Sequence, residues 1–132
     1  MKLKTLIVED ESLAALLLKL CLESYGCEVG GTVSTGELAV EMAKTMKPDI
    51  LFMDILLAGK MNGIEAAKII KTNDPPINIV YISAYSDPQI IEKAQAVGSC
   101  AYIQKPFEPE FLKATVEMIR HRLSGIAEPR GL

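Results

Sequence analysis

The chain has 132 residues, of which 49% are apolar and 23% are charged, and its formal net charge is −3. One domain usually takes roughly 100–200 residues, so we expect a single domain with a core of its own. The acidic balance argues against a protein that binds nucleic acid through bulk positive charge. No apolar run approaches the ~18 residues of a membrane span, and no signal peptide pattern is present. We therefore expect a cytoplasmic protein.

The first half of the chain predicts two strand–helix pairs. Residues 5–8 form a short apolar run that ends abruptly in three acids. Leucines then recur at helical spacing over residues 13–21. A second strand is predicted over residues 28–33, and residues 34–37 have the S-x-x-E spacing of a capping box ahead of a second helix.

The second half predicts three more strand–helix pairs. The strands are residues 50–53, 77–82 and 100–103, and the helices are residues 63–71, 88–97 and 109–123. Prolines at the first positions of the last two helices support those starts. Because the main strand runs are continuously apolar instead of alternating, we expect them to be covered on both faces. Alternating strands and helices predict an α/β fold with a parallel sheet and right-handed crossovers.

Polar residues stand directly after the predicted strands, and in open α/β sheets the working residues gather at these carboxyl ends. The residues at those ends are Glu9, Asp10, Asp54, Ser83 and Lys105. Three neighbouring carboxylates disfavour joint ionisation, and a divalent cation removes this conflict. An oxygen-only ligand set that leaves room for phosphate favours Mg²⁺. Lys105 can supply a point charge, and Ser83 a hydroxyl, to phosphoryl oxygens.

Each of these residues also has a plain structural interpretation. Glu9 and Asp10 can be solvated loop acids, Lys105 a surface lysine in a turn, and Ser83 a partner for the backbone. Their coincidence with the ends of separate core strands favours one shared site. The three cysteines include no C-x-x-C pair and accompany a single histidine, which favours reduced thiols over a zinc site; they are Cys21, Cys27 and Cys100.

The motif residues resemble the receiver domain of two-component response regulators over residues 4–123. They are Glu9-Asp10, Asp54, Ser83-Ala84 and Lys105-Pro106-Phe107. The resemblance implies a three-layer, flavodoxin-like (βα)5 fold, with a five-stranded parallel sheet in the order 2-1-3-4-5. It implies a receiver domain over residues 1–123 and a tail, or the start of a linker, over residues 124–132.

The resemblance further implies a phosphoaspartate switch. Asp54 would accept a phosphoryl group from a histidine kinase or a phosphotransfer protein. Mg²⁺ would be held by Asp10 directly and by Glu9 through water, together with Asp54 and the backbone carbonyl of Leu56. Aspartyl phosphates are established intermediates, and phosphoryl transfer requires mainly positioning and charge neutralisation, so the residue types fit this chemistry.

Three further roles follow from the resemblance. Ser83 and Lys105 would hold the phosphoryl oxygens, Tyr102 would move inward together with Ser83 on activation, and the Lys105–Pro106 bond would be cis. Such a protein would be no enzyme beyond its own phosphorylation and slow dephosphorylation. It would control an unidentified downstream effector, contact neither nucleic acid nor membrane directly, and be a monomer or a weak dimer.

The loop after Asp54 departs from the family pattern. Many receivers have a proline where this chain has Ala58, and the loop up to Gly63 is one residue longer than usual. Two positions also bear on the lifetime of a phosphoryl group. Leu56 and Tyr85 lie two residues beyond Asp54 and Ser83, and neither offers a carboxylate or amide to orient a hydrolytic water, which predicts slow dephosphorylation.

Other functions fit the sequence less well. A dinucleotide or FMN site needs a phosphate-binding loop where this chain has acids, and no G-x-x-x-x-G-K-[ST] loop exists. An aspartate-nucleophile phosphohydrolase would place a second carboxylate where this chain has Leu56. A receiver-like module that has lost phosphorylation conflicts with the intact Asp10, Asp54, Ser83 and Lys105.

Overall fold

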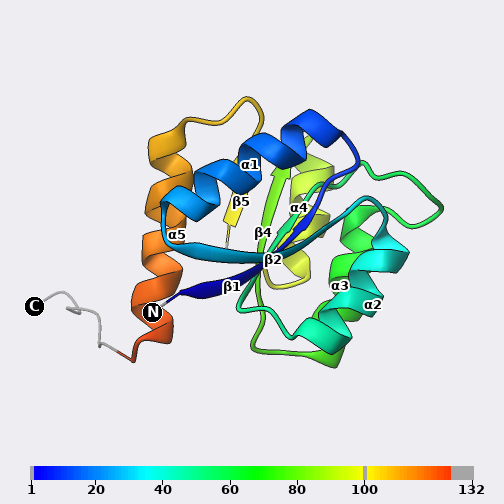
Figure 1. Ribbon diagram of the computed structural model, residues 1–132. Coiled ribbons are helices and arrows are strands. Elements are labelled where there is room, and N and C mark those ends of the chain that lie inside the picture. Colours follow the sequence, from blue (N-terminus) through cyan, green and yellow to red (C-terminus); the bar gives the residue numbers. More distant parts are fainter. Residues whose placement is uncertain (1, 100, 126–132) are drawn as a thin grey trace, which may run out of the picture.

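A five-stranded parallel sheet forms the centre of the molecule in the computed structural model, which describes residues 2–99 and 101–125 (Figure 1). Its strands are β1 (Leu3–Val8), β2 (Cys27–Val33), β3 (Ile50–Met53), β4 (Asn78–Ser83) and β5 (Ala101–Gln104). They pair in the order β2-β1-β3-β4-β5. The expected flavodoxin-like sheet and its strand order are confirmed.

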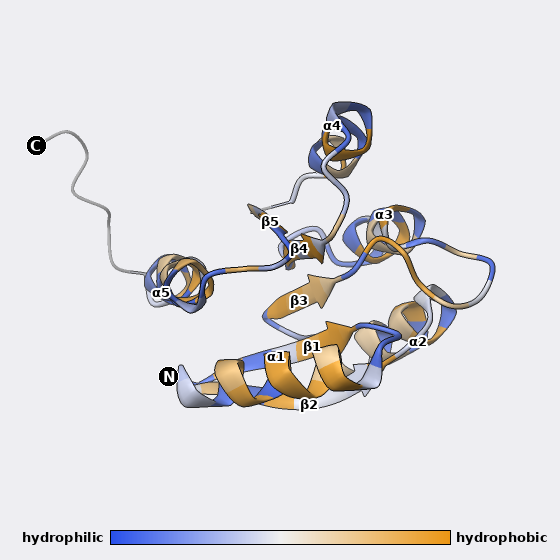
Figure 2. Ribbon diagram, turned by 90° about the horizontal axis from the view of Figure 1, so that it is seen from above, coloured by the Kyte–Doolittle hydropathy of each residue, from blue (hydrophilic) through white to orange (hydrophobic). Residues whose placement is uncertain are grey.

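Five helices cover the two faces of this sheet. They are α1 (Ser12–Ser24), α2 (Gly36–Met46), α3 (Gly63–Asn73), α4 (Pro88–Ala96) and α5 (Pro109–Leu123). Helices α1 and α5 pack on one face, whereas α2, α3 and α4 pack on the other, as the end-on view of Figure 2 shows. The result is three layers with one apolar core on each side of the sheet.

The central strands supply both cores. Every residue of β3 and β4 is buried, and successive side chains point to opposite faces: Leu51 and Met53 join one core, Ile50 and Phe52 the other. Strand β2 is not a continuous apolar run; it is the edge strand, and its residues alternate between more and less exposed. Its pairing with β1 also slips by one residue at Gly30.

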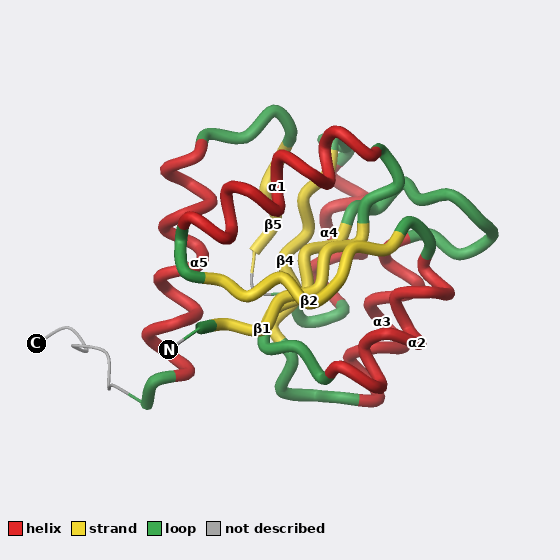
Figure 3. The backbone as a smooth tube through the Cα atoms, viewed as in Figure 1, coloured by secondary structure: helices red, strands yellow, loops and turns green. Residues whose placement is uncertain are grey.

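The capping box predicted at residues 34–37 is wrong, because the N-cap of α2 lies one residue later than predicted. Thr35 is the N-cap of α2, and its hydroxyl accepts a hydrogen bond from the Leu38 amide at 3.1 Å. The reason is tertiary, since Thr35 is held in extended conformation by a parallel bridge to Ala58. This bridge also anchors the long β3–α3 loop, which projects from the molecule in Figure 3. A capping box does occur at α3, where Asn62 and Glu65 exchange hydrogen bonds.

Most of the leucines whose spacing predicted α1 do not face the sheet. The residues of α1 that are buried against it are Ala15, Leu18 and Leu22. Four leucines point outward instead, with exposed fractions of 74% at Leu13, 51% at Leu16, 57% at Leu17 and 57% at Leu20. The helical period of the sequence was therefore correct, but α1 carries more leucines than the sheet can cover, which leaves an apolar outer surface.

Two of the three cysteines lie within the described residues. Cys27 is buried and Cys21 is half-buried, and both are free thiols; burial raises the pKa of Cys27. Cys100 and most of the predicted tail, residues 126–132, lie outside the described residues. Within the described part of the chain, none of the helices combines the length and the apolar composition that a membrane crossing requires.

Candidate functional site

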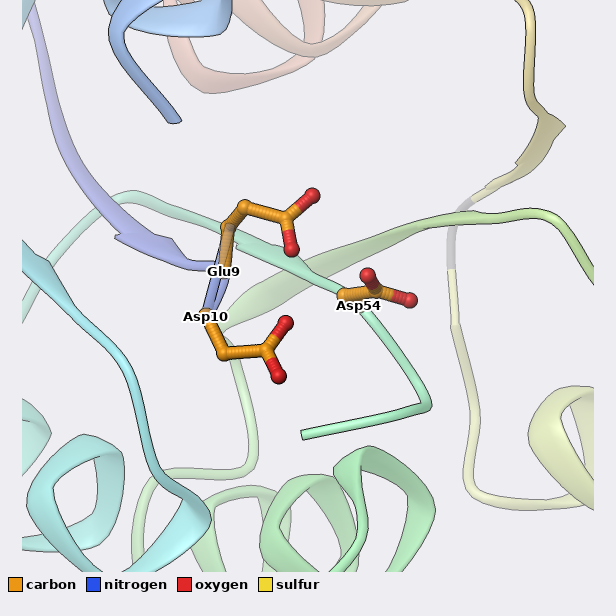
Figure 4. A group of neighbouring side chains, drawn as sticks. All are labelled: Glu9, Asp10 and Asp54. Atoms are coloured by element: carbon orange, nitrogen blue, oxygen red, sulfur yellow. The ribbon is translucent and has the colours of Figure 1, made fainter. Parts of the chain in front are cut away.

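Three carboxylates meet at the carboxyl edge of the sheet because β1 and β3 are parallel neighbours. Val8 pairs with Met53, so Glu9 and Asp54 follow directly at the same level. The backbone continues this register, with the Asp54 amide donating to the Val8 carbonyl at 3.0 Å. Asp10 is the next residue on β1's side, and Figure 4 shows the three side chains turned toward a shared space. One oxygen of each carboxylate lies within 4.8 Å of the others.

Lys105 follows β5, the edge strand opposite β2, and its side chain extends to this cluster. Its amide donates to the Ser83 carbonyl at 2.8 Å, which places it just beyond the β4–β5 pair. Its Nζ contacts Glu9 Oε1 and lies 3.1 Å from Asp54 Oδ2. Burial by itself lowers the pKa of Lys105, but hydrogen bonds to Glu9 and Asp54 outweigh it and raise the pKa overall. The lysine is therefore a fixed positive charge at the site.

The carboxylates differ in their surroundings. Glu9 is 6% exposed and Asp54 is 9% exposed, whereas Asp10 lies at the surface. Burial raises the pKa of Glu9, and the Lys105 hydrogen bond opposes this effect without cancelling it. Asp54 Oδ1 accepts a hydrogen bond from the Leu56 amide at 3.3 Å, so both of its oxygens have partners. The donor set is oxygen-only and fits a hard cation such as Mg²⁺.

Ser83 and Tyr102 lie next to this cluster. Ser83 is 1% exposed, and its hydroxyl accepts a hydrogen bond from the Tyr85 amide at 3.3 Å. The Tyr102 hydroxyl donates to the Tyr85 carbonyl at 2.9 Å, which holds the ring in an inward position. Burial raises the pKa of Tyr102, the nearby Ser83 hydroxyl lowers it, and the charge of Asp54 raises it further. The predicted switch residues are therefore close together.

Two features of the backbone support the site. The Lys105–Pro106 peptide bond is cis, as the resemblance implied. Gly63, the first residue of α3, packs against the chain just after β3: a Cβ there would lie 2.0 Å from the Asp54 carbonyl oxygen. Sequence reasoning missed this contact, although a glycine directly after an Asn cap was a visible signal.

An apolar groove adjoins the site and was also missed. Its volume is about 510 Å³, and it runs between α1 and the segment that leads into α5. Its lining includes Leu17 and Cys21 from α1, Phe107 and Pro109 from the segment that leads into α5, and Asp54 of the site. The exposed leucines of α1 continue this surface outward. The sequence showed the leucines, but it did not show that α5 lies beside them.

Residues 5–117 match the response regulator receiver domain. The chain is 39% identical to the chemotaxis protein CheY of Thermotoga maritima, over 80% of this chain and 88% of that protein. It is 34% identical to the transcriptional regulatory protein PdtaR of Mycobacterium tuberculosis, over 97% of this chain and 62% of that protein. It therefore spans less than two thirds of PdtaR.

Solved structures agree with this match. The signal receiver domain of a modulated diguanylate cyclase from Desulfovibrio desulfuricans G20 is 33% identical, with a TM-score of 0.85, over 96% of this chain and 100% of that one. CheY in the CheX–CheY–BeF3–Mg²⁺ complex from Borrelia burgdorferi is 27% identical, with a TM-score of 0.84, over 89% of each chain. This chain therefore belongs to the family of response regulator receiver domains.

Proposed function

We propose that this protein is a phosphoaspartate switch in which Asp54 accepts a phosphoryl group from a phosphohistidine donor in a Mg²⁺-dependent reaction. The observation that carries the proposal is the Lys105 ammonium 3.1 Å from Asp54 Oδ2, inside a cluster of three carboxylates. An Asp54 oxygen forms a bond to phosphorus while the bond between phosphorus and the donor imidazole nitrogen breaks. The bonding pair leaves with the imidazole, which then takes up a proton.

Glu9, Asp10, Asp54 and the Leu56 carbonyl would hold the metal. When bound, Mg²⁺ neutralises charge on the carboxylates and on the incoming phosphoryl oxygens. Lys105 contacts two of these carboxylates, which supports a role in which its ammonium would bind a phosphoryl oxygen on Asp54. Ser83, which is buried at the end of β4, would donate its hydroxyl hydrogen bond to another of these oxygens.

The outer surface of α1 is proposed as the docking site of the phosphodonor. A donor must bring its histidine to Asp54, and the groove that the exposed Leu17 lines also has Asp54 in its lining. An apolar helix face on the donor would match this surface. Four leucines on one helix form a small patch compared with the roughly 800 Å² per partner of a stable interface, which favours transient binding and a monomer or weak dimer.

The receiver unit is proposed to extend over residues 1–123, since α5 ends at Leu123, a few residues beyond the matched segment. A histidine kinase as donor would place the reaction in the cytoplasm, where free thiols such as Cys21 and Cys27 stay reduced. The effector that responds to phosphorylation is a separate protein or domain of unassigned identity.

Intact-mass measurement after treatment with acetyl phosphate tests the proposal. We expect the wild-type protein to gain one phosphoryl group with Mg²⁺ present and none in EDTA. Asp54→Asn should gain none, whereas Glu28→Gln, which changes an exposed acid of β2 far from the site, should behave as wild type. Labelling that persists in EDTA or in Asp54→Asn would overturn the proposal. Continuous turnover of acetyl phosphate without an adduct would favour a phosphohydrolase instead.

A further inference from the structure

Tyr81 lies in the middle of β4 and is completely buried. Among the described residues, its hydroxyl is the one buried side-chain polar atom with no hydrogen-bond partner. The loss of water without a replacement acceptor destabilises whichever arrangement encloses such a hydroxyl. Burial also raises the pKa of this phenol, so it stays protonated at neutral pH. The phosphoryl-transfer chemistry proposed above makes no use of it.

A second tyrosine, Tyr102, is in contact with Tyr81, and its hydroxyl has a hydrogen-bond acceptor. The ring centroids of Tyr81 and Tyr102 are 6.0 Å apart, with planes tilted by 37°. The Tyr102 hydroxyl donates to the Tyr85 carbonyl, whereas the Tyr81 hydroxyl has no acceptor among the described residues. The two phenols therefore act in opposite directions: one stabilises the inward position of Tyr102, and the other opposes the enclosed arrangement around both rings.

Helix α4 packs against the core cluster to which Tyr81 belongs and on which Tyr102 also packs, and little of this helix is buried. We call its position in this structure the closed position. Within α4, Ala94 alone is buried, whereas each of the other four helices has at least three buried residues. Ile90 and Val97, both half-buried, pack against the same core cluster as Tyr81. Of the five helices, α4 thus has the least apolar burial to lose by moving.

We propose that Tyr81 is a positioning residue for α4 whose unpaired hydroxyl keeps the closed position of this helix only marginally favoured. In a second position of α4 the hydroxyl gains a partner, and the hydrogen bond from Tyr102 to Tyr85 is given up. The two positions are then close enough in free energy for a small input to choose between them. The link to signalling rests on the proposed function, because phosphorylation of Asp54 would supply that input through Ser83 and Tyr102.

Hydrogen–deuterium exchange of the α4 amides, residues 89–96, tests this proposal in the unphosphorylated protein without metal. Tyr81→Phe keeps the ring and removes the unpaired hydroxyl, so α4 should exchange about five- to ten-fold more slowly than in wild type. Tyr102→Phe removes the paired hydroxyl and should have the opposite effect. The amides of α3 are the reference within each protein, because a general change in stability would move both helices alike.

The sign of the Tyr81→Phe effect separates a bias from simple packing. If Tyr81 only filled space, removal of its hydroxyl would leave α4 exchange unchanged or make it faster, and either result would overturn the proposal. Beryllofluoride with Mg²⁺ provides an independent arm. We expect it to slow α4 exchange in wild type and to add less in Tyr81→Phe, where the closed position is already favoured. If beryllofluoride leaves the exchange rate of the α4 amides unchanged in wild type, the proposed function is contradicted. The comparison of wild type with Tyr81→Phe in the absence of metal still decides the role of Tyr81.

Discussion

The Lys105 ammonium lies 3.1 Å from the Asp54 carboxylate although 51 residues separate the two in the chain. Strand β4 stands between the strands that precede them, and the parallel register brings both residues to one edge of the sheet. The same ammonium also contacts Glu9. A cation bound by these carboxylates would share them with Lys105, and the lysine lowers the mutual repulsion of the carboxylates in the absence of a cation.

The first prediction concerns this competition. In EDTA, Lys105→Met should lower the free energy of unfolding by about 1–3 kcal/mol, since it leaves buried carboxylates without a charged donor. Mg²⁺ should then raise the melting temperature of the variant by more than that of wild type, because the cation replaces the missing charge. Thermal unfolding with and without Mg²⁺ measures both effects. Lys113→Met, an exposed lysine of α5, is the control, and equal stability of both variants in EDTA would contradict the prediction.

A second prediction follows from the raised pKa of Glu9. Its folded-state pKa exceeds the ordinary value of 4.5, so the protonated form stabilises the fold below that pH, and this contribution is lost as the pH rises through the folded-state pKa. Glu9→Gln should therefore be at least as stable as wild type at pH 7, and the difference should disappear near pH 4. Mg²⁺ binding by wild type should weaken, on acidification, at a higher pH than an ordinary glutamate would give.

Urea unfolding across this pH range, with Glu28→Gln as the control at an exposed strand position, measures the stability difference. Calorimetric titration with Mg²⁺ follows the binding. The account of Glu9 would be wrong if Glu9→Gln were clearly less stable than wild type at pH 7 in the absence of metal.

The third prediction concerns the contact of Gly63 with the chain after β3. A methyl group at this position would overlap the Asp54 carbonyl oxygen, which is a backbone atom and cannot rotate away. Gly63→Ala should cost about 3 kcal/mol of stability and slow phosphorylation of Asp54. Gly31→Ala is the matched control, because its Cβ would meet only side-chain atoms, at 3.4 Å and beyond. Similar melting temperatures for the two variants would show that α3 can move away without cost.

The fourth prediction concerns the lifetime of the phosphoryl group. The Leu56 side chain is 63% exposed beside Asp54, and Tyr85 is half-buried next to Ser83, so neither presents a group that orients a hydrolytic water. Leu56→Asn combined with Tyr85→Glu should speed phosphate loss about ten-fold if water positioning is worth ~1.4 kcal/mol. The mass-resolved decay after removal of the phosphodonor measures this rate, with Leu123→Asn, at the exposed last residue of α5, as a control. Decay of the wild type within seconds, or no acceleration in the double variant, would refute the argument.

The elements of the fold could be predicted from the sequence because their signals are local. The apolar runs of β3 and β4 are buried at every position, and α4 begins at Pro88 as predicted. The site followed from the same logic, since the carboxyl ends of parallel strands share one edge of the sheet. Its five side chains needed no contact information to be proposed, only their places after the strands.

Relationships between distant segments were decided by the tertiary structure alone. The leucine period of α1 indicated a helix, but which of its faces meets the sheet depends on how much apolar surface the strands and α5 leave for it. Likewise, nothing near Tyr81 in the chain shows that its hydroxyl lacks an acceptor. A glycine after Asn62 marks Gly63 as unusual, but it does not identify the Asp54 carbonyl as the group that fills the space of the missing side chain. A sequence pattern reports the conformation that a segment prefers, whereas contacts, burial and hydrogen-bond satisfaction depend on what the rest of the chain places opposite it.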